Sequence, residues 1–250
     1  IKDLSSSLTL NPNNAQTYSS RGYYKAQAGD YNGAIKDLSS SLSLNPNNAQ
    51  TYNSRGYYKT QMGNFKGALS DYSAAIDINP LEPENYISRG WTYFNLGDYA
   101  QANLDYEKVL DIGDPIQKLD SIIYLIENNL ILSKLSKVPD LIEKAKLLLN
   151  QSDNKEKEAA LLYAESRYYL FIGNFKKSEE LSKKCLAKTN DSIYENACSS
   201  LLSNIYIVNE DYEKAKKFIK FRTYEGQLSL AYIAFVEKKL QKAERILKRL

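Results

Sequence analysis

Histidine is absent from this sequence of 250 residues. Its absence excludes Ser-His-Asp and Cys-His nucleophile pairs, and it excludes metal sites that depend on imidazole ligands. No glycine-rich phosphate-binding loop and no cluster of carboxylates stands apart from the general pattern. We therefore predict that the chain is not an enzyme and holds no cofactor and no metal.

Cysteine is scarce, with only Cys185 and Cys198 in the whole sequence. Two cysteines cannot form a disulfide framework, and free cysteine commonly packs as a small core residue. We interpret both as buried thiols, although spacing alone does not decide whether they are bridged. Their scarcity favours the cytoplasm slightly and leaves the periplasm and the cell surface open.

Long apolar runs are also lacking, and none approaches the ~20 residues that a membrane span needs. No signal-peptide pattern opens the chain either. We expect no membrane span in this segment.

The charge is nearly balanced, at +3 overall, with 43% hydrophobic and 25% charged residues. These values are typical of a folded globular protein. Residues 1–114 carry 9 basic and 12 acidic side chains, and the remainder carries 24 basic and 18 acidic ones, so the second half is mildly basic. Acidic residues are interleaved with the lysines there, which is typical of a solvated helix face, and we do not expect nucleic-acid binding. The basic residues concerned are Lys176, Lys177, Lys183, Lys184, Lys214, Lys216, Lys217, Lys220 and Arg222, and the acidic ones are Glu179, Glu180, Glu210, Asp211 and Glu213.

Short segments recur every 34 residues in the first part of the chain. An Asn-Pro pair, an Arg-Gly pair, a turn with Gly and an aromatic residue, and a small alanine all keep this spacing, which predicts a repeat architecture. The segments are Asn11-Pro12, Asn45-Pro46 and Asn79-Pro80; Arg21-Gly22, Arg55-Gly56 and Arg89-Gly90; Gly29-Asp30-Tyr31, Gly63-Asn64-Phe65 and Gly97-Asp98-Tyr99; and Ala34, Ala68 and Ala102.

Each repeat is predicted to be a helical hairpin. In the first repeat, residues 15–28 are expected to form one helix, which Gly29 ends and after which Asp30 caps the next helix. Residues 31–44 carry apolar side chains at helical spacing, and Asn45-Pro46 ends this second helix. Gly22 in mid-helix costs about 1 kcal/mol relative to alanine, so we expect the neighbouring helix to pack closely there.

These residues resemble the tetratricopeptide repeat, and the third unit matches it best through Tyr86, Gly90, Tyr93, Gly97, Tyr99, Ala102 and Pro115. The resemblance implies an all-α, right-handed superhelical solenoid of helical hairpins. Units one and two depart from the pattern, because Lys25 and Lys59 stand where the third unit has Tyr93.

The resemblance is specific over residues 1–115, and we expect residues 116–250 to form divergent, irregular hairpins of the same kind. There, similar turns recur at Gly173-Asn174-Phe175 with Ser178, at Glu210-Asp211-Tyr212 with Ala215, and at Leu240 with Ala243. We predict an elongated helix over about residues 116–137, ended by Val138-Pro139. On this phase Ile1 begins inside the second helix of a unit, so we expect the chain to be part of a longer protein.

An aspartate follows each repeated arginine by sixteen residues, in the second helix of the hairpin. A bidentate guanidinium-carboxylate contact would tie the two helices together, and we expect a structural role for these pairs rather than an arginine row for anionic ligands. The pairs are Arg21 with Asp37, Arg55 with Asp71, and Arg89 with Asp105.

Side chains on the first helices fall on one face, at spacings i, i+3, i+4, i+7 and i+11. We call this set the groove stripe, because the resemblance implies that it lines the concave groove where extended peptides bind. Its residues are Gln16, Ser19, Ser20, Tyr23 and Gln27; Gln50, Asn53, Ser54, Tyr57 and Gln61; and Glu84, Ile87, Ser88, Trp91 and Asn95.

The groove stripe suits a peptide, since amides can pair with a peptide backbone and aromatic rings can cover apolar side chains. Related repeats that hold acidic chaperone tails use a carboxylate clamp of Lys, Asn and Arg, and this clamp is absent. Ser19, Tyr23, Ser54, Glu84 and Ser88 occupy its positions.

Protein or peptide binding in the groove is therefore the leading hypothesis. The alternatives are a structural spacer or an assembly surface, including homo-oligomerisation, a carbohydrate ligand, and a duplicated polar surface without a ligand. The sequence does not identify the partner.

Overall fold

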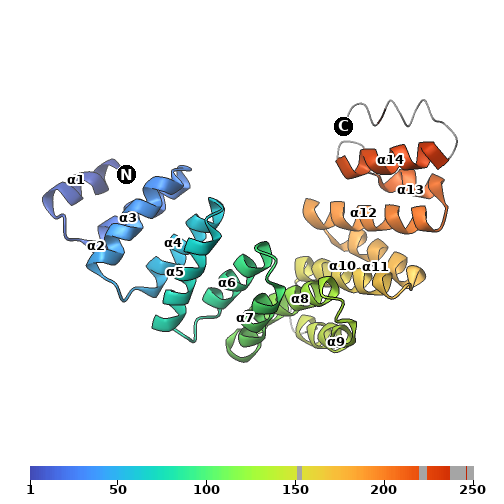
Figure 1. The fold of residues 1–250 in the computed structure, drawn as a ribbon, viewed down its shortest axis with the longest axis horizontal. Helices are drawn as coiled ribbons and strands as arrows, with labels where there is room; N and C mark the ends of the chain where they lie inside the picture. The colour runs from blue at the N-terminus through green and yellow to red at the C-terminus, as the bar shows by residue number, and fades with distance from the viewer. Residues whose placement is uncertain (151–153, 220–223, 237–245, 247–250) are drawn as a thin grey trace. The chain divides into compact units, whose positions relative to one another are not determined.

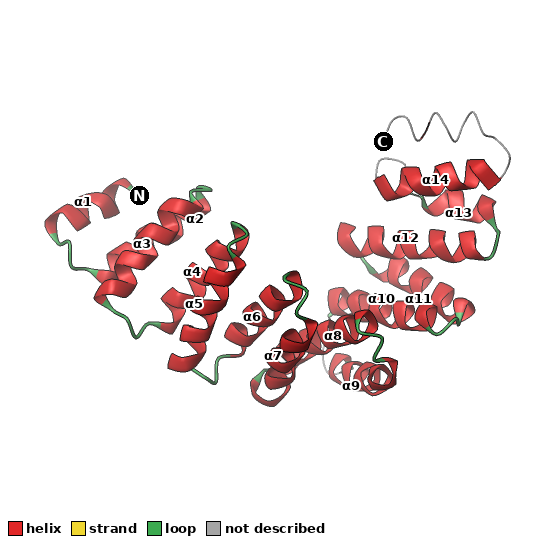
Figure 2. Cartoon of the chain, viewed as in Figure 1, coloured by secondary structure: helices red, strands yellow, loops and turns green. Residues whose placement is uncertain are grey.

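The computed structural model describes residues 1–150, 154–219, 224–236 and 246. Every regular element in these residues is helical, which confirms the all-α prediction (Figure 2). The chain divides into two compact units, residues 1–128 (unit 1) and 129–250 (unit 2), and each is described by itself. The expected repeat signal at Leu240 and Ala243 lies outside the described residues.

Unit 1 is a row of helical hairpins that follow one another in chain order (Figure 1). Three pairs pack most closely, α2 with α3, α4 with α5, and α6 with α7. The second helix of one pair packs against the first helix of the next, α3 against α4 and α5 against α6. The bounds are α1 Lys2–Leu10, α2 Ala15–Gln27, α3 Tyr31–Leu44, α4 Ala49–Gln61, α5 Phe65–Ile78, α6 Pro83–Asn95, α7 Tyr99–Ile112 and α8 Pro115–Ile131.

The turns of unit 1 follow the predicted chemistry. Gly29 adopts a φ of +82°, a left-handed conformation that glycine allows, and the carboxylate of Asp30 then accepts a hydrogen bond from the Gly33 N–H at 2.8 Å. The Asn14 side chain caps α2 in the same way by accepting from the Thr17 N–H at 3.0 Å. These local signals explain why the helices begin and end where the repeat places them.

The mid-helix glycines lie where the second helix of the hairpin approaches most closely, as expected. A Cβ at Gly56 would stand 2.9 Å from the ring of Tyr72, and one at Gly22 would stand 3.1 Å from the Ala34 carbonyl oxygen. The repeated alanines, including Ala34, are fully buried. Small side chains on both helices therefore allow the close contact that forms each hairpin core.

Unit 2 continues with helices of less even length. Its elements are η1 Leu135–Lys137, α9 Val138–Leu149, α10 Lys155–Phe171, α11 Phe175–Lys188, α12 Ser192–Val208, α13 Tyr212–Phe218 and α14 Tyr224–Val236. The turns predicted around residues 173–175 and 210–212 do separate helices, α10 from α11 and α12 from α13.

The predicted elongated helix over residues 116–137 is wrong at its end. Helix α8 stops at Ile131, Ser133 takes a positive φ of 55°, and the Lys134 N–H donates to the Asn129 carbonyl at 2.8 Å, which closes the helix end. Val138 then begins α9 rather than ending a helix. Pro139 stands in the first turn of α9, where its missing N–H has no helical partner to lose.

The interpretation of Cys185 and Cys198 as free thiols is also wrong, because the structure joins them in a disulfide. Both are fully buried, as expected. They lie on the adjacent helices α11 and α12 with their Cα atoms 6.6 Å apart, a separation at which a bridge can form. This proximity depends on the packing of the two helices, and the spacing in the sequence does not reveal it.

Candidate functional site

The repeated arginines and aspartates of unit 1 form bidentate pairs. In the first repeat, Arg21 donates from Nε to Asp37 Oδ2 at 2.8 Å and from Nη2 to Asp37 Oδ1 at 2.7 Å. The aspartate side chain is 3% exposed, so the guanidinium compensates a carboxylate that water hardly reaches. The other pairs, Arg55 with Asp71 and Arg89 with Asp105, have the corresponding distances of 2.9 and 2.7 Å.

Each arginine also contacts the hairpin before its own. The Arg55 Nη1 donates to Ser39 Oγ of α3 at 3.0 Å, so one side chain ties α3, α4 and α5 together. The equivalent contacts join Arg21 to Ser5 at 3.2 Å and Arg89 to Ser73 at 3.0 Å. Sequence analysis did not identify these serines, although their 34-residue spacing was a signal that could have found them.

A lysine adds a second cation in the first two repeats only. Lys25 contacts Asp37 Oδ2 at 2.8 Å, and Lys59 contacts Asp71 Oδ2 at 2.7 Å. Burial acts to raise the pKa of Asp37, but the hydrogen bonds and charges of the arginine and the lysine outweigh it and hold that pKa below its usual value.

The third repeat has Tyr93 at the lysine position, and Arg89 is then the cation that faces Asp105. Burial raises the pKa of Asp105 above its usual value, and Arg89 offsets this effect only in part. The lysines that depart from the family pattern thus have a structural partner.

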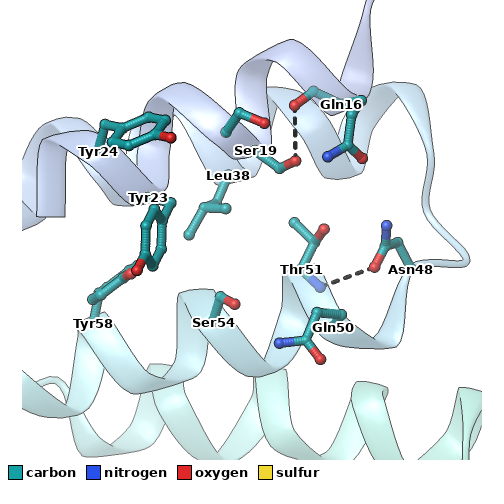
Figure 3. Close-up of a pocket in the computed structure, with 11 residues that line it drawn as sticks. Gln16, Ser19, Tyr23, Tyr24, Leu38, Asn48, Gln50, Thr51, Ser54 and Tyr58 are labelled. Atoms are coloured by element: carbon teal, nitrogen blue, oxygen red, sulfur yellow. Dashed lines mark hydrogen bonds between the residues drawn. The ribbon is translucent and has the colours of Figure 1, made fainter. Parts of the chain in front are cut away.

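Between α2 and α4 the groove stripe lines a first cavity of about 330 Å³ (Figure 3). Hydroxyl and amide side chains gather at one end, and Tyr23 from α2 points toward Tyr58 from α4 at the other. The lining residues are Gln16, Ser19, Ser20, Tyr23, Tyr24, Leu38, Asn48, Gln50, Thr51, Ser54 and Tyr58.

A second cavity, of about 220 Å³, lies between α4 and α6 and is also lined by one residue of α5 and one of α8. A tryptophan and a single carboxylate distinguish it from the first cavity. The lining residues are Tyr57, Thr60, Gln61, Tyr72, Glu84, Ile87, Ser88, Trp91 and Tyr124.

Three residues of the predicted stripe line neither cavity. Gln27 lies exposed beyond the first cavity. Asn53 donates from Nδ2 to Asn85 Oδ1 at 2.8 Å, and Asn95 donates to the Trp91 carbonyl of its own helix at 2.7 Å. The structure brings the other stripe residues together, and it adds neighbours such as Leu38, Tyr58, Tyr72 and Tyr124 that sequence analysis missed.

No basic side chain lines either cavity in the described residues. All basic residues of α2, α4 and α6 contact the buried aspartates of the second helices, on the side of each first helix away from the stripe. These residues are Arg21, Lys25, Arg55, Lys59 and Arg89. A carboxylate clamp for acidic tails is therefore not formed.

Glu84 is the charged residue of the second cavity. Glu84 as a residue is exposed to solvent, but partial burial of its carboxyl group raises its pKa above the usual value, and the charges of Glu82 and Asp120 act in the same direction. No basic side chain among the residues that line this cavity balances the Glu84 charge.

Several basic residues of unit 2 pair with acidic neighbours. Lys183 contacts Glu179 at 2.6 Å, Lys184 contacts Glu180 at 2.7 Å, and further pairs of this kind lie on α11 and α13. Pairs of this kind are typical of a solvated helix face, and α11 carries five lysines and two glutamates in all. Lys220 and Arg222 lie outside the described residues.

The described part of the chain offers no group of three or more side chains suited to a metal ion. None of its helices combines the length and the apolar character of a membrane span.

Comparison with known proteins agrees with this architecture. The tetratricopeptide repeat family model matches residues 15–48, 49–80 and 83–112. No curated protein matches the sequence significantly.

Solved structures resemble the chain at low identity. A tetratricopeptide repeat protein from Parabacteroides merdae is 16% identical, with a TM-score of 0.69 over 97% of this chain and 90% of that one. The type IV pilus biogenesis factor PilW is 15% identical, with a TM-score of 0.70 over 86% and 98%. YrrB, a tetratricopeptide protein with an unusual peptide-binding site, is 14% identical, with a TM-score of 0.60 over 76% and 94%. Residues 15–112 of this chain are therefore tetratricopeptide repeats, and its described helices share the solenoid fold of tetratricopeptide-repeat proteins.

Proposed function

We propose that unit 1 binds an extended peptide segment of a partner protein along the groove stripe. Tetratricopeptide repeats generally mediate protein-protein interactions, and this chain carries three of them. The observation that carries the proposal is the pair of neighbouring cavities that the groove stripe lines. The proposal assigns binding to the regular repeats of residues 1–115, to which the divergent residues 116–250 add Tyr124 at the second cavity.

The chemistry of the first cavity supports a peptide ligand. Glutamine amides and serine hydroxyls can donate to and accept from a peptide backbone without selecting its side chains. Tyrosine rings provide apolar area with little loss of conformational entropy, because each side chain has few rotatable bonds. YrrB, with its unusual peptide-binding site, provides a precedent within the same fold.

The exposure of the aromatic side chains favours binding over a spacer role. Tyr23 is 53% exposed, Tyr57 is 51% exposed and Trp91 is 40% exposed. A spacer would have these rings covered by its own segments, because exposed aromatic surface has a free-energy cost in water. A row of accessible rings above polar groups is typical of a recognition surface.

The test is selection from a library of random peptides, followed by binding measurements on variants. Peptides selected on the wild-type protein should lose at least tenfold in affinity for the triple variant Tyr23→Ala, Tyr57→Ala, Trp91→Ala. The matched control removes three exposed apolar side chains outside the groove stripe, by Leu44→Ala, Leu81→Ala and Leu104→Ala, and should bind as the wild type does.

Circular dichroism of all variants checks that the helices remain. Equal binding by the triple variant and the wild type would reject the groove stripe as the binding surface. Selection that yields no peptide at all, together with self-association of the chain, would favour the assembly role instead.

A further inference from the structure

The two cavities share four equivalent positions of successive repeats, and they differ in charge. Ser54 of the first cavity corresponds to Ser88 of the second, 34 residues later, and Gln50 corresponds to Glu84 in the same way. The repeat therefore replaces a neutral amide by a carboxylate of nearly the same shape.

Aromatic rings line the same cavity as this carboxylate. Tyr57 comes from α4, Trp91 from α6 and Tyr124 from α8, and each keeps a third or more of its surface exposed. The face of an aromatic ring attracts a cation, most strongly for tryptophan, and the attraction grows when water is displaced. The cavity volume of about 220 Å³ is below the ~300–1,000 Å³ of sites for drug-sized ligands and suits a single side chain.

The charges around the cavity favour the same kind of occupant. Glu82 and Asp120 lie close enough to act on the ionisation of Glu84, and both make the potential more negative. The basic residues of the first helices contact aspartates elsewhere, so none of them compensates Glu84. An incoming cation would pair with the Glu84 carboxylate, which has no basic neighbour among the residues that line the cavity.

We propose that the second cavity is a specificity pocket for one basic side chain, arginine or lysine, of the peptide bound along the groove stripe. The first cavity would hold neighbouring residues of that peptide without a charge requirement. The inference rests on the proposed peptide-binding function and adds the chemical class of the residue that the third repeat selects.

Trp91 is the sole tryptophan of the chain and lines this pocket, so its fluorescence reports occupancy directly. The probes are N-acetylarginine amide and its neutral isostere N-acetylcitrulline amide, followed by N-acetyllysine amide and N-acetylnorleucine amide. We expect saturable changes with the two cationic probes, and an affinity at least fivefold weaker for each neutral partner. Equal responses to arginine and citrulline would overturn the inference.

The matched variants are Glu84→Gln and Glu107→Gln. Glutamine stands at the equivalent position 50, so Glu84→Gln should fold. Glu107 is an exposed carboxylate of α7 that lines neither cavity, and Glu107→Gln removes the same charge outside the pocket. Glu84→Gln should weaken the arginine probe at least fivefold, while Glu107→Gln should leave it unchanged. The same loss in both variants would point to the net charge of the protein and would reject the pocket.

The peptide library separates this inference from the function on which it rests. Selected peptides should share one basic residue, and replacing that residue by citrulline should weaken binding to the wild type but not to Glu84→Gln. Peptides that bind the groove stripe without a preferred basic residue would reject the pocket and leave the proposed function standing. If no selected peptide depends on the groove stripe, the proposed function and this inference both fail.

Discussion

Replacing Arg89 by alanine should destabilise unit 1 more than replacing Arg55, because the two aspartates left behind keep different partners. In the wild type both guanidinium groups make bidentate contacts of 2.7 and 2.9 Å, and both carboxylates are nearly inaccessible to water. Without Arg55, Asp71 retains Lys59 at 2.7 Å. Without Arg89, Asp105 retains no ion pair among the described residues, since Tyr93 stands at the lysine position.

The expected loss of stability depends on the buried carboxylate that each variant leaves without its arginine. A carboxylate that loses its charged partner in a protein interior typically costs ~3–5 kcal/mol, which is the expected loss for Arg89→Ala. A surviving cation reduces this loss, so Arg55→Ala should cost about 1.5–3 kcal/mol. Each variant also loses a contact with a tyrosine ring, and these losses are similar. The guanidinium carbon of Arg55 lies 5.5 Å from the ring centre of Tyr52, and that of Arg89 lies 5.8 Å from the ring centre of Tyr86.

Urea unfolding followed by circular dichroism and by Trp91 fluorescence measures both variants, and the tryptophan reports unit 1 specifically. Lys66→Ala, which removes an exposed lysine of α5, is the control and should stay within about 0.5 kcal/mol of the wild type. An equal or larger loss for Arg55→Ala would refute the reasoning. Stability near the wild-type value in both arginine variants, with peptide affinity reduced instead, would assign the arginines to ligand binding.

Three further predictions concern single groups. Burial acts to raise the pKa of Asp37, but the cations beside it hold that pKa below the usual value. Lys25→Met should therefore lower the free energy of unfolding by about 1–2 kcal/mol at neutral pH. This difference from the wild type should shrink as the pH falls below about 4, where the wild-type aspartate also protonates. Urea unfolding across this pH range measures the loss of stability. The control is Lys36→Met, which changes an exposed lysine, and a similar pH-dependent loss in this control would contradict the role assigned to Lys25. Gly56→Ala should lose about 1–3 kcal/mol despite better helix propensity, because the new Cβ would stand 2.9 Å from the buried ring of Tyr72; a rise in the melting temperature would contradict this close packing. The two cysteines should give no free thiol on titration of the unfolded, unreduced protein, and detection of two thiols would exclude the disulfide.

The regular repeats of unit 1 could be predicted because their signals are local. A capping side chain such as Asp30, a glycine with positive φ such as Gly29 and a proline after the hairpin act within a few residues, and the 34-residue period repeats them. Beyond residue 115 the period weakens, and Pro139 illustrates the consequence. The same proline can follow one helix or begin another, and only the packing around α9 decides between the two.

The groove stripe could be predicted in part, since positions on one helix face follow from helical periodicity. The residues that close the cavities from other helices, such as Tyr58 and Tyr124, depend on how neighbouring helices rotate and pack. Asn95 was expected in the stripe, but its amide bonds to its own backbone instead. Contacts of this kind are decided by side-chain conformation, which the sequence pattern does not contain.

Amide chemical-shift mapping with a selected peptide tests the central claim most directly, because it locates the bound ligand on the chain. The account predicts that the largest shifts fall on α2, α4 and α6, at residues that line the two cavities, and that α3, α5 and α7 change little on their solvent faces. Shifts concentrated on the second helices or in unit 2 would contradict it.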